Sequence, residues 1–172
     1  MQSEKSIKEK LKYAQEYGQD VQNIIWENCE ESQIKIQKAE IDKSKFLNCK
    51  CTEADFSRSH FTNVIFENCD FSNTNFSETE FTDVQFINCK MIGCNFTDSS
   101  IYKNKIEQSN FEYTNFSNSI IKNTKLIEVN LKGAALGECK LKETKWEECN
   151  LMQAQLFRTS LKNVDFRTCN IE

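Results

Sequence analysis

A five-residue repeat is the feature that most constrains what this chain can fold into. Every fifth residue from Trp26 to Ile171 is apolar, with Glu31 as the single charged member of the series. Of the 13 Phe residues, only Phe157 lies outside this series. Two residues before each large side chain, from position 39 onward, stands Ala, Ser, Cys, Thr or Val, with Asn104 as the exception. The repeat unit is therefore small–polar–large–polar–polar.

This period matches neither of the regular secondary structures. A helix repeats every 3.6 residues and a strand every 2.0. A period of five indicates a backbone that turns a corner every five residues, with the small and the large side chain inside and the polar ones in water. The chain contains no Pro, as expected for a long uninterrupted ladder of backbone hydrogen bonds.

A second repeat of twenty residues indicates how many corners complete one circuit. Cys29, Cys49, Cys69 and Cys89 recur at this spacing, and each follows an Asn. Identical side chains stack in this way where parallel strands lie in register. Four units per circuit predict a square solenoid, and roughly seven coils at ~4.8 Å spacing give a rod of about 35 Å.

The repeat units resemble those of the pentapeptide-repeat proteins, whose motif is A(D/N)LXX. In this chain they read CDFSN, TNFSE, CNFTD and VNLKG, and the resemblance covers residues 24–171. It implies an all-β fold, a right-handed quadrilateral parallel β-helix.

The N-terminal residues differ from the repeat and predict a separate element. Ser6 and Glu9 have the spacing of a capping box, and Gly18 suits the end of a helix. Ile7, Leu11 and Ala14 would share one helical face. We expect a helical cap over residues 1–20 and the β-helix over 21–172.

The sequence gives little support for catalysis, a metal site or a cofactor. Eight of the nine Cys occupy the small inward position, and one Cys per coil does not supply four converging zinc ligands. The single histidine, His60, is on its own weak support for a nucleophile activated by a base. We therefore expect a non-enzyme that binds no cofactor and whose thiols pack in the interior.

The predicted location is the cytoplasm. The N-terminus has no apolar segment of the kind found in secretory signals, and no run of apolar residues is long enough to span a membrane. The net charge is −4, and we expect neither membrane association nor direct nucleic acid binding.

One outward column is the candidate partner-binding surface. Its members recur every twenty residues and alternate between acidic and aliphatic side chains: Glu27, Leu47, Glu67, Ile87, Glu107, Ile127 and Glu147. Lys105, Lys125 and Lys145 precede the last members by two residues and partly balance their charge. We expect a binding or scaffold solenoid whose partner is a protein.

The resemblance also implies an alternative. One branch of the family mimics duplex DNA and binds DNA gyrase or topoisomerase IV, protecting them from quinolones or peptide toxins. Mimicry needs continuous negative charge along the rod. Residues 1–86 contain 10 basic and 16 acidic side chains, and residues 87–172 contain 12 and 10. This division of charge between the two halves argues against a uniformly negative rod.

The C-terminal coil predicts a second contact surface. Its inward side chains would be left open at the end of the rod: Leu156, Leu161, Phe166 and Ile171. An open strand edge invites pairing, and the DNA-mimic branch is dimeric through its C-terminal ends. We expect a homodimer formed end to end through these residues.

Overall fold

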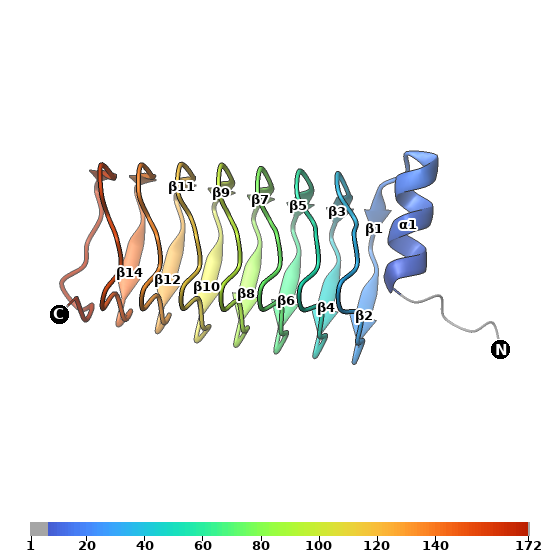
Figure 1. The fold of residues 1–172 in the computed structure, drawn as a ribbon, viewed down its shortest axis with the longest axis horizontal. Coiled ribbons are helices and arrows are strands. Elements are labelled where there is room, and N and C mark those ends of the chain that lie inside the picture. The colour runs from blue at the N-terminus through green and yellow to red at the C-terminus, as the bar shows by residue number, and fades with distance from the viewer. Residues whose placement is uncertain (1–6, 172) are drawn as a thin grey trace.

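A short helix and a rod of stacked coils make up the computed structural model, which describes residues 7–171 (Figure 1). Helix α1 (Ile7–Tyr17) lies across the N-terminal end of the rod, beside β1. Two residues of this helix, Leu11 and Ala14, are buried. Ser6, the predicted capping residue, and the rest of residues 1–6 lie outside the described residues, as does the side chain of Ile7.

Two parallel sheets form two of the four sides of the rod. The larger has eight strands in the order β1-β3-β5-β7-β9-β11-β13-β15. Their bounds are β1 (Val21–Gln22), β3 (Glu40–Asp42), β5 (His60–Thr62), β7 (Glu80–Thr82), β9 (Ser100–Tyr102), β11 (Ile120–Lys122), β13 (Lys140–Lys142) and β15 (Ser160–Lys162).

The second sheet has seven strands, one from each of seven successive coils, in the order β14-β12-β10-β8-β6-β4-β2. Their bounds are β2 (Ile25–Glu27), β4 (Lys45–Leu47), β6 (Ile65–Glu67), β8 (Gln85–Ile87), β10 (Lys105–Glu107), β12 (Lys125–Ile127) and β14 (Lys145–Glu147). In both sheets the partners are parallel and twenty residues apart, as Phe66 pairs with Phe86. The predicted parallel β-solenoid is confirmed.

The other two sides are held by isolated bridges and turns instead of strands. Bridges such as Asp70↔Lys90 and Asn75↔Asn95 keep the same twenty-residue register. On these sides the backbone closes turns, since the N–H of Thr74 donates to the carbonyl of Phe71 at 3.0 Å. The four sides of the square are therefore of two kinds, although their sequence pattern is the same.

The inward series fills the axis of the rod. Phe rings of successive coils stack on one another, as Phe61 on Phe81 at 5.2 Å and Phe66 on Phe86 at 5.0 Å. Ser, Thr and Cys at the small inward positions donate from their hydroxyl or thiol groups to backbone carbonyls of the preceding coil, as Thr74 does to Cys51 at 2.9 Å and Cys94 to Phe71 at 3.0 Å. Within the described residues, no helix has the length and apolar character needed to cross a membrane.

Candidate functional site

The seven candidate partner-binding residues lie in one straight column on the seven-stranded sheet. Each occupies the third position of its strand, and the pairing of β2 with β4 sets Glu27 beside Leu47. The same register continues through every strand to Ile127 beside Glu147. We call this set the acidic–aliphatic column. It spans the length of the sheet without interruption.

Lysines neutralise the C-terminal part of this column. The Lys105 Nζ lies 2.8 Å from Glu107 Oε2. Glu147 contacts Lys145 on its own strand and Lys125 on the neighbouring strand. The hydrogen bond from Lys145 holds the pKa of the Glu147 carboxyl below its usual range.

The N-terminal part of the column keeps its negative charge. Among the described residues, neither Glu27 nor Glu67 forms an ion pair. The aliphatic members, such as Leu47 and Ile87, are half-buried between their strand neighbours. The N-terminal end of the column thus offers unpaired carboxylates and apolar side chains. The C-terminal end offers carboxylates paired with lysines, together with apolar side chains.

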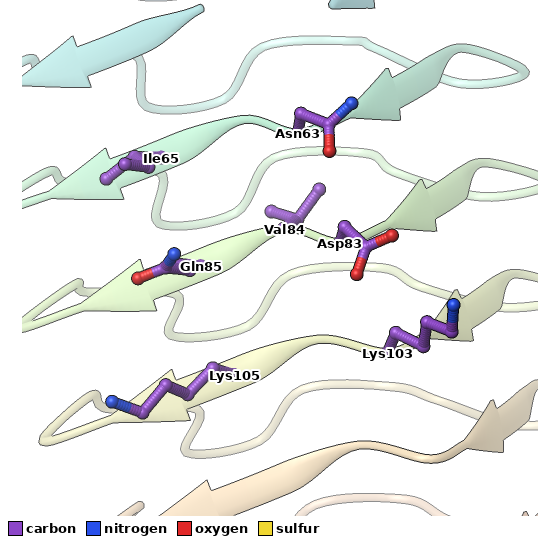
Figure 2. A pocket seen from close by; sticks show the side chains of 7 residues that line it. All are labelled: Asn63, Ile65, Asp83, Val84, Gln85, Lys103 and Lys105. Atoms are coloured by element: carbon purple, nitrogen blue, oxygen red, sulfur yellow. The ribbon is translucent and has the colours of Figure 1, made fainter. Parts of the chain in front are cut away.

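A shallow depression of about 320 Å³ follows the corner between the two sheets. It is lined by side chains of three successive coils (Figure 2): Asn63, Ile65, Asp83, Val84, Gln85, Lys103 and Lys105. Asp83 and Lys103 project from adjacent coils at its rim (Figure 2). Its lining combines one carboxylate, two ammonium groups and two side-chain amides with the apolar Ile65 and Val84.

The predicted dimer end lies at the C-terminal coil, opposite α1 (Figure 1). Leu161 is 52% exposed and Ile171 is 66% exposed. Leu156 and Phe166 are half-buried, and the Phe166 ring packs edge-on against Trp146 at 5.3 Å. The described chain therefore leaves Leu161 and Ile171 largely uncovered and covers Leu156 and Phe166 in part; we call these four side chains the C-terminal patch.

Six of the nine cysteines stack at the corner where the seven-stranded sheet ends: Cys29, Cys49, Cys69, Cys89, Cys149 and Cys169. The thiol of Cys69 lies 3.3 Å from the carbonyl oxygens of both Phe46 and Glu67. Burial raises the pKa of Cys29 to about 11 and that of Cys149 to about 12, whereas the hydrogen bond with Cys69 lowers the pKa of Cys89. A protonated thiol is a poor nucleophile, which agrees with a packing role for Cys29 and Cys149.

An Asn ladder runs beside the thiols and shows a backbone feature that the sequence analysis missed. The side-chain amide of Asn88 donates to Asn68 at 2.8 Å, and Asn68 donates to Asn48 at 3.2 Å. These residues have φ between 50° and 53°, in the left-handed region. The last residue of nearly every five-residue unit shares this conformation. Asn and Gly favour it, so the frequent Asn at this position was the available signal.

Comparison with known proteins gives one family and several similar folds. The family described as the pentapeptide repeat region matches residues 59–136 and 105–172. No protein with a curated description matches the chain.

Two solved structures illustrate the likeness of fold. QnrB1, a plasmid-mediated fluoroquinolone resistance protein studied as a trypsin-treated R167E form, aligns with a TM-score of 0.73 and 18% identity, over 87% of this chain and 80% of QnrB1. HetL from the cyanobacterium Nostoc, a pentapeptide repeat protein involved in the regulation of heterocyst differentiation, aligns with a TM-score of 0.51 and 10% identity, over 96% of each chain. At these identities the likeness concerns the fold alone.

Proposed function

Because the chain belongs to the pentapeptide-repeat family, we propose that it is a cytoplasmic, non-enzymatic binding protein whose partner is another protein. The acidic–aliphatic column carries this proposal. It sets apolar side chains at every second strand of the seven-stranded sheet, with carboxylates between them. Protein interfaces combine an apolar centre with polar contacts in this manner.

The alternative is a DNA mimic that binds DNA gyrase or topoisomerase IV. The likeness to QnrB1, a fluoroquinolone resistance protein, supports considering it. The ion pairs count against it, since Lys105 and Lys145 neutralise Glu107 and Glu147. Negative potential is then confined to the part of the column around Glu27 and Glu67, whereas DNA is negative along its whole length.

The proposal includes dimerisation end to end through the C-terminal coil. The exposed fractions of Leu161 and Ile171 support this contact, because contiguous exposed apolar side chains mark protein–protein contact surfaces. A second copy would supply an identical apolar patch, as a twofold axis requires. Such a dimer would leave the acidic–aliphatic column of both copies open to a partner.

The test replaces the aliphatic members of the column while leaving the interior intact. The variant carries Leu47→Asp, Ile87→Asp and Ile127→Asp, and the matched control carries Thr52→Asp, Ile92→Asp and Met152→Asp on a side without strands. Chemical cross-linking in cells that express the tagged chain, followed by quantitative mass spectrometry, identifies bound proteins. We expect a partner that the control retains and the column variant loses. Equal recovery with both variants would contradict the proposed surface.

A gyrase supercoiling assay, with and without ciprofloxacin, decides on the alternative. Inhibition or drug rescue that disappears in Glu27→Lys with Glu67→Lys would establish mimicry and replace the proposed function. The same assay with folded protein and no effect at tens of micromolar would remove the alternative.

A further inference from the structure

The outward charges of the eight-stranded sheet are divided between its two halves. The first and third residues of each strand point outward, and the second is buried in all strands from β3 to β13. The strands near α1 carry the acids Glu40, Asp42 and Glu80. The strands near the C-terminal coil carry Lys122, Lys140, Lys142 and Lys162. The midpoint of the sheet lies between β7 and β9.

The lysines are stacked on each other without a matching set of acids. Lys122 pairs in register with Lys142, and Lys142 with Lys162. Like charges directly opposite in a sheet are destabilising. Lys142 is 3.7 Å from Glu143, but within residues 7–171 no ion pair involves Lys140 or Lys162. This half of the sheet therefore carries a positive charge that the described chain does not neutralise.

We propose that this sheet is a docking surface for a second copy of the chain, packed face to face with the two rods antiparallel. The twofold axis lies in the interface, parallel to the strands, and passes between β7 and β9. Because the coils of both copies have the same spacing along the rod, every strand of one copy meets a strand of the other. The twofold rotation sets β3 against β13. It brings Glu40 opposite Lys140 of the second copy. It also brings Asp42 opposite Lys142.

The charges at the corner that follows this sheet are also complementary under the same twofold rotation. The operation sets β7 against β9, so that Asp83 meets Lys103; both line the depression in Figure 2. At the same corner Lys43, which follows β3, meets Glu143, which follows β13. No charged residue of the sheet or of this corner then faces a like charge. An axis along the rod would instead set every strand against its own copy, so that Glu40 would face Asp42 and Lys140 would face Lys142.

The identical repeat favours a second copy over an unrelated acidic partner. A different protein has no reason to place its carboxylates at the ~4.8 Å spacing of these strands. In the present chain Glu40 and Asp42 occupy the first and third positions of β3, which are the positions that Lys140 and Lys142 occupy on β13. The interior contacts of each rod are unchanged by the association, because only outward residues take part.

The dimensions of the sheet predict a weak and salt-sensitive dimer. Seven strand spacings of ~4.8 Å by three extended residues give a face of about 34 by 10 Å. Two such faces bury less than the ~1,200 Å² of a stable interface. Charge pairs of this kind contribute modestly and are screened by salt. The association uses neither the acidic–aliphatic column nor the C-terminal patch, so it is independent of the proposed function.

Sedimentation equilibrium at ~0.02 M and ~0.5 M salt tests the proposal. Two variants each reverse one side of the contact: Glu40→Lys with Asp42→Lys, and Lys140→Glu with Lys142→Glu. We expect the unmodified chain to associate more tightly at low salt. We expect each variant alone to dissociate at least about tenfold more readily, a loss of about 1.4 kcal/mol. An equimolar mixture of the two should regain association, because each copy then offers the charge that the other needs.

A control of equal charge change excludes a general effect of net charge. Lys50→Glu with Lys132→Glu alters a side of the rod without strands, and this variant should associate as the unmodified chain does. Circular dichroism verifies that every variant is folded. The proposal is overturned if the unmodified chain is monomeric at low salt, if either sheet variant still associates normally, or if the mixture stays monomeric. If the chain associated only through its C-terminal coil, the two sheet variants would associate as the unmodified chain does. The experiment therefore distinguishes the sheet interface from the C-terminal one.

Discussion

The interior of the middle coils and that of the last coil contain the same kinds of residue but differ in burial. Phe66 and Phe86 are at most 2% exposed, with each ring enclosed by coils on both sides. Leu161 and Ile171 occupy equivalent inward positions and are 52% and 66% exposed. A coil in a solenoid has no core of its own, and its inward side chains are buried only by its neighbours.

Polar residues at inward positions reveal the same difference. Glu31 is the charged member of the inward series, and it lies in the first coil, where it is only half-buried. Asn104 lies in a middle coil and is 3% exposed. Its side-chain oxygen accepts from the N–H of Val84 at 2.8 Å, but its Nδ2 has no hydrogen-bond partner. Near the end of the rod a misplaced polar group reaches water, and in the middle it does not.

The largest effect is expected from Phe66→Ala, which removes a ring from the middle of the stack. The ring contacts those of Phe46, Phe71 and Phe86 at centroid distances of 4.9 to 5.2 Å. Truncation of a buried Phe leaves a cavity and costs about 3–5 kcal/mol. Urea denaturation should show this loss in the free energy of unfolding. A loss near 1 kcal/mol would mean that the neighbouring coils collapse into the space.

A gain in stability is expected from Asn104→Thr. At the next coil the Thr124 hydroxyl lies 3.3 Å from the carbonyl oxygen of Ile101, and the N–H of Asn104 donates to that hydroxyl at 3.3 Å. A Thr at position 104 would accept from Val84 in the same way and would leave no buried amide unpaired. Removal of an unsatisfied buried donor is worth about 1–3 kcal/mol. The matched reverse variant, Thr124→Asn, should lose stability by a similar amount in the same denaturation experiment.

The sequence was sufficient to predict which side chains face inward, and Phe66 and Asn104 are examples. It was also sufficient to predict that the residues of the acidic–aliphatic column lie side by side, because the twenty-residue period alone determines which residues pair between neighbouring strands. It did not predict which two sides form strands, since all four carry one pattern and the choice depends on backbone geometry. It did not predict the left-handed residues either, because Lys103 and Glu128 adopt that conformation as Asn123 does. Contacts between coils such as Lys125 with Glu147 depend on side-chain rotamers, which a period does not specify.

The smallest effect is expected from Leu161→Ala in the last coil, and its size depends on association. With about half of the side chain already in water, the loss should be about 1 kcal/mol, since full burial of Leu is worth about 1.5–3 kcal/mol. That value applies at low protein concentration. If two copies pair through this coil, Leu161 becomes buried, and the loss should grow with concentration toward that of a middle coil. Thermal unfolding of both forms over a hundredfold range of concentration would measure it. A difference in melting temperature that stays constant over this range would contradict end-to-end pairing, and would leave the last coil as an interior surface open to water.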